Sequence, residues 1–146
     1  MTRAFLDANV YFAGFHSSAG ASALILELGH RQKLSLVSSK IVLREADRNL
    51  RKKSSPAALR AFHRYLQQTK IRVIPAPDEK TSRPYEALIH PKDLPVLVAA
   101  VISKAEFFIT LDRGHFMKTE LLTKMKGMKI ITPGDFLHDH YLKGKI

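Results

Sequence analysis

The sequence predicts an α/β fold of three layers, in which helices cover both faces of a central, mostly parallel sheet of four to five strands. Short apolar runs alternate along the chain with segments of helical periodicity, which is typical of strand–helix–strand units. The runs are mainly apolar rather than alternately apolar and polar, as expected for strands buried on both faces. The chain has 146 residues, of which 45% are hydrophobic. Residues 1–146 are therefore predicted to form a single domain around one core.

The first half of the chain supplies three predicted strands and four predicted helices. The strands are short, mainly apolar runs at residues 4–6, 34–37 and 71–74. Helical spacing of apolar residues predicts helices around residues 10–15, 19–33, 41–50 and 57–69. Ser38 or Ser39 is expected to cap the third helix, because a serine hydroxyl accepts a hydrogen bond from a free N–H group of the first turn.

The second half of the chain begins with a long irregular segment. Residues 75–92 contain four prolines and are predicted to form a loop around a short helix at 85–89. Residues 94–104 are apolar around most of the helix circumference, which predicts a largely buried helix. The last two strands are predicted at 107–111 and 129–131, and Pro133 is expected to begin a C-terminal helix.

Composition limits the classes of function. The 24 Lys and Arg against 13 Asp and Glu give a formal charge of +11, which favours a polyanionic partner such as nucleic acid. The absence of cysteine excludes a disulfide framework, a thiol nucleophile and a cysteine zinc site. No apolar run approaches the roughly 18–20 residues of a membrane span, and Asp7 comes too early for a signal peptide. A cytoplasmic protein without membrane association is expected.

Four acidic residues stand where a ligand is expected. Asp7 and Asp112 follow the first and fourth predicted strands, so they lie at the same edge of a parallel sheet, where α/β proteins bind ligands. Asp93 begins the buried helix before the fourth strand, and Glu45 lies about two turns into the helix after the second. Taken singly, Asp7 and Asp93 are typical helix caps and Asp112 is a typical turn residue.

Taken together, the four acids indicate a different role. Carboxylates that share a site repel one another unless a cation compensates their charge. Hard divalent cations prefer sites built from oxygen ligands. One or two such ions orient a water molecule and stabilise the charge that develops when a phosphodiester is cleaved. The acids therefore indicate a divalent metal site suited to that chemistry.

The arrangement of these residues resembles the PIN-domain ribonucleases, and particularly the VapC-like toxins of toxin–antitoxin systems. The resemblance extends over nearly the whole chain and rests on the order and spacing of five motifs. They are FLDANV at 5–10, SKIVLRE at 39–45, KDLPVLVAA at 92–100, FITLDRGHF at 108–116 and IITPGDFL at 130–137.

The resemblance implies a metal-dependent endoribonuclease that uses one or two Mg²⁺ or Mn²⁺ ions. The catalytic and metal-binding acids of the family correspond here to Asp7, Glu45, Asp93 and Asp112. Asp7 and Asp112 are expected to bind metal directly, and Glu45 and Asp93 to bind it through water or to orient the nucleophile. Asn9 and Thr110 match the polar residues that orient the first and last acids through hydrogen bonds. Ala8 departs from the pattern, because a small hydroxyl residue often stands there.

The implied partners are an RNA substrate, a small antitoxin protein and a second copy of the chain in a homodimer. Arg44, Arg48 and Arg51 recur at helical spacing beside Glu45, and Lys52 extends the row. This basic stripe is expected to contact RNA phosphates, although a solvated helix face explains many such rows.

Other functions fit the sequence less well. Asn9 stands where haloacid-dehalogenase phosphatases need a second acid, and neither a glycine-rich dinucleotide turn nor a Walker phosphate loop is present. Two alternatives stay open on the same fold: a housekeeping RNA-processing nuclease and a non-catalytic nucleic-acid-binding module.

Overall fold

The computed structural model describes residues 1–146, which form a five-stranded parallel sheet in the order β3-β2-β1-β4-β5. The strands are β1 (Arg3–Leu6), β2 (Ser35–Ser39), β3 (Ile71–Ile74), β4 (Phe107–Ile109) and β5 (Lys129–Ile131). Three consecutive residues of the central strand, Ala4, Phe5 and Leu6, are fully buried. Because successive side chains of a strand point to opposite faces, helices must cover both faces of β1. The predicted α/β fold is confirmed.

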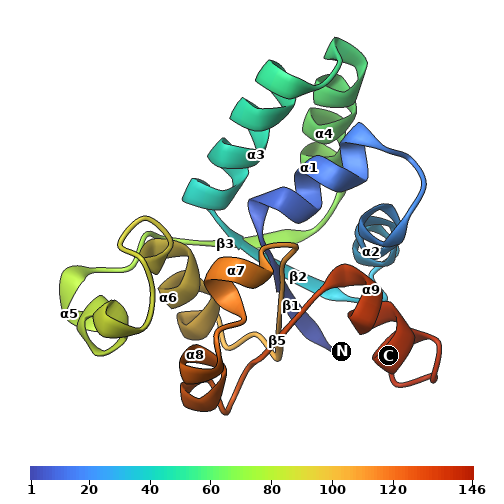
Figure 1. Ribbon diagram of the computed structural model, residues 1–146. Coiled ribbons are helices and arrows are strands. Elements are labelled where there is room, and N and C mark those ends of the chain that lie inside the picture. The colour runs from blue at the N-terminus through green and yellow to red at the C-terminus, as the bar shows by residue number, and fades with distance from the viewer.

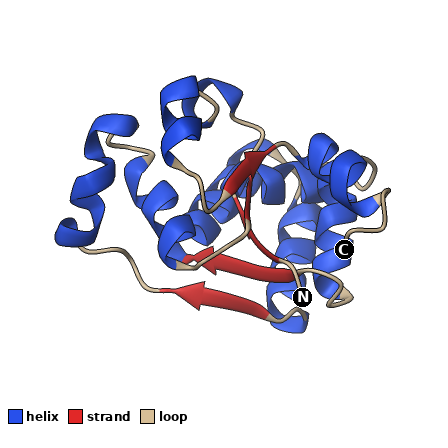
Figure 2. Ribbon diagram, turned by 90° about the horizontal axis from the view of Figure 1, so that it is seen from below, coloured by secondary structure: helices blue, strands red, loops and turns tan.

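The helices lie around this sheet (Figures 1 and 2). They are α1 (Ala8–His16), α2 (Ala21–His30), α3 (Lys40–Lys53), α4 (Pro56–Gln68), α5 (Glu79–Ser82), α6 (Leu94–Ile102), α7 (Arg113–Phe116), α8 (Thr119–Lys124) and α9 (Pro133–Phe136). A 3₁₀ segment η1 (Arg83–Leu88) follows α5, and a π-helical turn η2 (Leu137–Tyr141) follows α9. Figure 1 shows α1, α3 and α4 side by side, and each pair of them is in contact. No helix is long and apolar enough to cross a membrane.

Aromatic side chains hold the layers together. Phe5 and Phe108 meet edge to face across neighbouring strands, with ring centroids 5.7 Å apart. Tyr11 of α1 packs against Phe62 of α4, and Phe15 contacts the same ring. Such pairs add to the stabilisation gained by burying the ring area. They fix α1, which begins directly after Asp7, against α4.

Several predicted boundaries are confirmed, while the segment 75–92 differs from its prediction. Ser39 caps α3 as expected, since its hydroxyl accepts a hydrogen bond from the Val42 N–H. Helix formation after β3 begins earlier than predicted, because Asp78 accepts a hydrogen bond from the Thr81 N–H at 2.7 Å and so caps α5. The predicted short helix at 85–89 is the end of the 3₁₀ segment.

The chain after β4 also departs from the prediction. The strand ends at Ile109 instead of 111, because the Leu111 N–H donates to the Asn9 side chain rather than to a neighbouring strand. The two short helices α7 and α8 follow, and neither was predicted. Their lengths of 4 and 6 residues are too short for a helical period to be visible in the sequence.

Candidate active site

The four predicted acids line one cleft at the carboxyl edge of the sheet. Asp7 and Asp112 follow β1 and β4, which are paired with Leu6 opposite Ile109, so the two carboxylates leave the sheet side by side. Helix α3 contributes Glu45, and Asp93 stands just before α6. The cleft has a volume of about 240 Å³. Its lining residues are Asp7, Ala8, Asn9, Ile41, Glu45, Arg48, Asn49, Lys92, Asp93, Val96, Asp112 and Phe116.

Asp7 is the most deeply placed of these acids, with only 8% of its surface exposed. One carboxylate oxygen accepts a hydrogen bond from the Ala8 N–H at 2.8 Å, which caps α1. The other oxygen accepts from the Thr110 hydroxyl at 2.7 Å and from the Asn9 amide at 3.2 Å. Asp7 is thus a helix cap, as its sequence context suggested, and also part of a polar network that opens into the cleft.

Thr110 and Asn9 extend this network to the segment after β4. The Thr110 hydroxyl accepts a hydrogen bond from the Asp112 N–H at 3.0 Å. The Asn9 side-chain oxygen accepts from the Leu111 N–H at 3.1 Å. The two polar residues therefore tie the backbone that carries Asp112 to the residues around Asp7.

Burial raises the pKa of Asp7 from 3.8 to about 6. The hydrogen bonds from Thr110 and Ala8 lower the pKa, and the negative charges of Glu45 and Asp112 raise it further. A carboxylate that is desolvated and surrounded by like charges favours a nearby cation. This electrostatic state is the clearest sign in the structure that the cleft suits a positively charged ligand.

The raised pKa of Asp7 predicts a pH dependence of stability. Between about pH 4 and pH 6 the folded protein binds the Asp7 proton more tightly than the unfolded chain does, so the stabilisation is present at low pH and is lost as the pH rises through 6. Without metal, wild type should therefore lose up to about 3 kcal/mol of unfolding free energy relative to Asp7→Asn between about pH 4 and pH 7. Denaturant unfolding of both proteins across this range measures the difference, and parallel pH profiles would contradict the prediction.

Asp93 does not cap α6 with its side chain, contrary to the simple structural interpretation. Its Oδ2 atom is buried, receives no well-directed hydrogen bond and lies 3.0 Å from Nδ1 of His115. Asp112 caps α7 by accepting a hydrogen bond from the His115 N–H, and its Oδ2 also lies 3.0 Å from Nδ1 of His115. His115 therefore contacts two of the four acids at once.

The donor set of the cleft fits a hard divalent cation. The four carboxylates and the Asn9 amide are oxygen ligands of the kind that Mg²⁺ and Mn²⁺ prefer, and Asp7 is desolvated among like charges. In the present arrangement, no group of three Asp, Glu or His side chains is placed to hold an ion, and an ion held by one or two carboxylates would complete its coordination with water.

A sequence model of the PIN domain matches residues 3–114, a segment that includes all four acids. The chain belongs to the PIN-domain family. PIN domains are nucleases, which are hydrolases. Membership thus places the clustered acids within a family whose chemistry is the cleavage of nucleic acid.

Solved structures share the PIN fold of this chain. VapBC2 from Rickettsia felis, bound to a DNA fragment from its promoter, matches with a TM-score of 0.61 and 15% identity, over 90% of this chain and 98% of that chain. PAE2754 from Pyrobaculum aerophilum matches with a TM-score of 0.61 and 23% identity, over 94% of this chain and 88% of that chain. A search of curated proteins finds no significant match. At these identities, the likeness establishes the fold.

The residues of the basic stripe of α3 have different surroundings in this PIN domain. Arg48 lines the cleft, whereas Arg44 and Lys52 are exposed outside it. Arg51 contacts the Asp47 carboxylate at 3.1 Å, so part of its charge is compensated within the helix.

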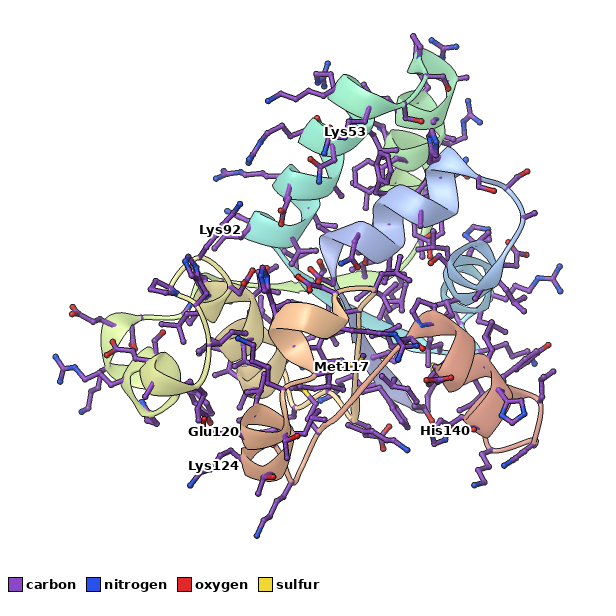
Figure 3. The ribbon with its side chains drawn as sticks, viewed as in Figure 1. Lys53, Lys92, Met117, Glu120, Lys124 and His140 are labelled. Carbon is purple, nitrogen blue, oxygen red and sulfur yellow. The ribbon has the colours of Figure 1, made fainter.

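Sequence reasoning missed two polar residues at the site. Lys92 and Asn49 line the cleft, and Figure 3 shows Lys92 beside α3. Lys92 directly precedes Asp93, and this proximity along the chain is the signal that could have identified it. His115 lies three residues after Asp112, a position that by sequence suits either a turn residue or a phosphate contact.

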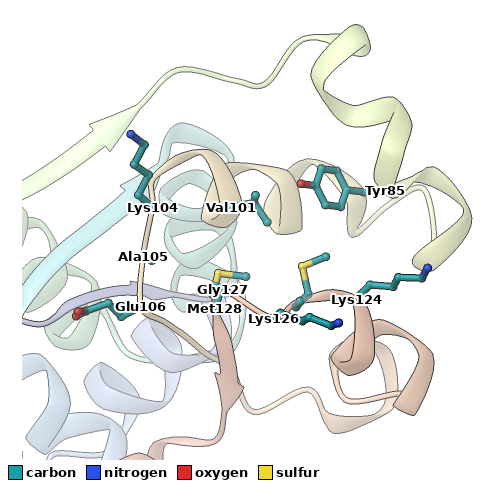
Figure 4. A pocket seen from close by; sticks show the side chains of 10 residues that line it. Tyr85, Val101, Lys104, Ala105, Glu106, Lys124, Lys126, Gly127 and Met128 are labelled. Carbon is teal, nitrogen blue, oxygen red and sulfur yellow. The ribbon is translucent and has the colours of Figure 1, made fainter.

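A second cleft of about 330 Å³ lies at the opposite edge of the sheet, near the starts of β4 and β5 (Figure 4). Its walls are partly apolar and include Tyr85 and Met128, with Lys124 and Lys126 beside them. None of the four predicted acids and none of the basic residues of α3 lines this second cleft.

Proposed function

We propose that this PIN domain is a metal-dependent endoribonuclease that acts in the cytoplasm as the toxin of a toxin–antitoxin pair, with residues 1–146 forming a single domain. The observation that carries the proposal is the meeting of four acids from four separate chain segments in one cleft. The raised pKa of Asp7 supports a cation there. The excess of basic residues supports a nucleic-acid substrate.

The residues of the cleft divide the work of phosphodiester hydrolysis. Asp7 and Asp112 would hold the ion directly, while Glu45 and Asp93 would hold it through water or orient the attacking water molecule. A bound Mg²⁺ or Mn²⁺ ion supplies a water of lowered pKa and neutralises the leaving oxygen. The Thr110 hydroxyl donates a hydrogen bond to the Asp7 carboxylate, which fixes the orientation of that group.

Arg48 and Lys92 are the cationic residues best placed to contact RNA phosphates. They come from α3 and from the turn before α6, and both line the cleft that holds the acids. Phosphate contacts of this kind strengthen binding without specifying sequence. The two side chains would therefore place a phosphodiester beside the ion regardless of the adjoining bases.

Replacing Arg48 or Lys92 by glutamine is expected to weaken RNA binding about tenfold at moderate salt, through loss of a charge-assisted phosphate contact. The slope of log Kd against log salt should become shallower by about 1. Titrations of the RNA with each protein in EDTA, where no cleavage is expected, measure both effects at several salt concentrations. Lys143→Gln, an exposed change outside the cleft, is the control. Equal losses in all three variants would assign the effect to net charge alone.

The proposed activity is tested by incubating purified protein with a mixed RNA pool in Mg²⁺, in Mn²⁺ and in EDTA. We expect cleavage in at least one metal and none in EDTA. Salt-sensitive RNA binding without cleavage in either metal would instead support the non-catalytic binding module. A mixed pool is needed because phosphate contacts leave the RNA target open.

The toxin role has a separate test. The structural neighbour VapBC2 is a complex bound to promoter DNA, which supports a small antitoxin as partner here. A homodimer of the chain is proposed as well, on the resemblance to VapC-like toxins. Induced expression of the chain is expected to arrest growth, and co-expression of a small protein encoded beside it to restore growth. Nuclease activity in vitro with unaffected growth would favour the housekeeping RNA-processing role.

A further inference from the structure

The ring of His115 lies between two of the four acids. Its Nδ1 atom is 3.0 Å from Oδ2 of Asp93 and 3.0 Å from Oδ2 of Asp112. The two carboxylates come from the turn before α6 and from the N-cap of α7, so no local sequence relation brings them together. The imidazole of His115 contacts both carboxylates and so links the two segments.

The two contacts at Nδ1 are not equivalent to two good hydrogen bonds. A ring nitrogen carries at most one hydrogen, so it cannot serve two acceptors fully. Oδ2 of Asp93 is buried and receives no well-directed hydrogen bond. A buried carboxylate oxygen in this state loses solvation without full compensation. Binding a cation at Oδ2 of Asp93 would therefore compensate the lost solvation better than the present contact does.

His115 itself is weakly held. Its side chain is 58% exposed, and the ring makes no hydrogen bond beyond its contacts with the two acids. The backbone N–H of the same residue donates to Asp112 at 3.0 Å, so the main chain stays anchored when the ring rotates. Rotation about the side-chain bonds thus moves the imidazole into solvent without disturbing α7.

We propose that His115 competes with the divalent ion for Asp93 and Asp112, and so lowers the metal affinity of the cleft. The proposal rests on the metal dependence of the proposed function. Nδ1 of His115 contacts the Oδ2 atoms of both acids. Of these acids, Asp112 would hold the ion directly, and Asp93 would hold it through water or orient the attacking water. Ion binding at these carboxylates would therefore displace the ring toward solvent.

The test compares Mn²⁺ binding to wild type, His115→Ala and His115→Ser by calorimetry and by electron paramagnetic resonance of free Mn²⁺. Removing the ring should tighten Mn²⁺ binding about tenfold, the equivalent of one charge-assisted contact. The Mn²⁺-induced rise in Tm should be larger in both variants than in wild type, because ligand stabilisation grows with affinity. Circular dichroism confirms that the variants are folded.

His138→Ala is the matched control. His138 also contacts a carboxylate through Nδ1, at 2.9 Å from Asp139, and is exposed outside the cleft. Its removal should leave Mn²⁺ affinity unchanged, which separates competition at the cleft from a general change in charge or stability.

Three outcomes would overturn the proposal. Unchanged Mn²⁺ affinity in the His115 variants would show that the ring does not compete. Weaker binding, together with a nitrogen coupling in the electron spin-echo spectrum of wild type, would make His115 a metal ligand instead. In both cases the proposed metal-dependent nuclease stands. Failure of every protein to bind Mn²⁺ would overturn this proposal and the metal dependence together.

Discussion

Replacing Asp7 by asparagine is expected to abolish metal-dependent RNA cleavage, with a loss of at least about 1,000-fold in rate, because catalysis depends on charge stabilisation by the ion. The substitution removes a negative charge from the deepest carboxylate of the cleft. The asparagine oxygen can still accept the hydrogen bond from the Ala8 N–H, so the cap of α1 survives. We therefore expect an inactive protein that folds normally.

The same substitution should stabilise the metal-free protein. Burial raises the pKa of Asp7 to about 6, so at neutral pH the charged form costs free energy in the folded state. Removing that charge is worth up to about 3 kcal/mol, less what is lost when the amide faces the hydroxyl of Thr110 and the amide of Asn9. At roughly 2–4 °C per kcal/mol for a chain of this size, the Tm should rise by several degrees.

Cleavage assays with Mn²⁺ and thermal unfolding in EDTA measure the two effects on one preparation. Asp78→Asn is the control, because asparagine also caps helices well and Asp78 is outside the cleft. It should change neither activity nor Tm appreciably. An Asp7→Asn protein that cleaves RNA at the wild-type rate would refute the assignment of Asp7 to the metal site.

Replacing Thr110 by valine should lower Mn²⁺ affinity and cleavage by about 10–100-fold, the usual effect of removing a residue that orients a metal ligand. The change keeps the shape of the side chain but removes the hydroxyl that donates to Asp7 and accepts from the Asp112 N–H. Asp7 then loses its shortest hydrogen bond, and the backbone at Asp112 loses its anchor. Both changes widen the range of positions available to the two carboxylates.

Two comparisons separate orientation from general destabilisation. Thr110→Ser retains the hydroxyl and should recover most of the metal affinity. Thr132→Val removes the hydroxyl of another buried threonine, which accepts a hydrogen bond from the Asp135 N–H and caps α9. It should lower stability without changing Mn²⁺ affinity. Equal losses of Mn²⁺ affinity in the Thr110→Val and Thr132→Val proteins would refute an orienting role for Thr110.

The two variants bear on different steps of the proposed function. Asp7→Asn tests whether the cleft needs this carboxylate at all, while Thr110→Val tests how strictly it must be oriented. His115→Ala adds the opposite expectation, a gain in metal affinity. A set in which one variant binds metal more tightly and two bind it more weakly cannot result from a common loss of stability.

The sequence by itself determined the fold class and the positions of the four acids along the chain. The alternation of short apolar runs with helical segments identified the strands and their parallel arrangement. Because carboxyl ends of parallel strands share an edge, Asp7 and Asp112 were expected to be neighbours, and β1 and β4 are indeed paired. The expectation that Asn9 and Thr110 orient them came instead from the resemblance to PIN-domain ribonucleases.

Only the tertiary structure decided which polar groups contact one another. The Asn9 side chain meets the Leu111 N–H across 102 positions of sequence, and this contact ends β4 earlier than its apolar pattern predicts. The placement of Asp93 and Lys92 in the cleft depends on how α6 lies against the sheet. Neither the Asn9–Leu111 contact nor the placement of Asp93 and Lys92 is encoded in local periodicity. That periodicity shows which face of an element is apolar but not which residues pack against it.

The tertiary structure also decided which charged residues contact one another. Four basic residues on and beside one helix face are equivalent by spacing, yet only Arg48 enters the cleft, while Arg51 is bound to Asp47. His115 is an ordinary turn residue by sequence, but packing brings it to two carboxylates at 3.0 Å. Sequence patterns fix burial and local geometry, whereas electrostatic contacts depend on distances of a few ångströms that only tertiary packing sets.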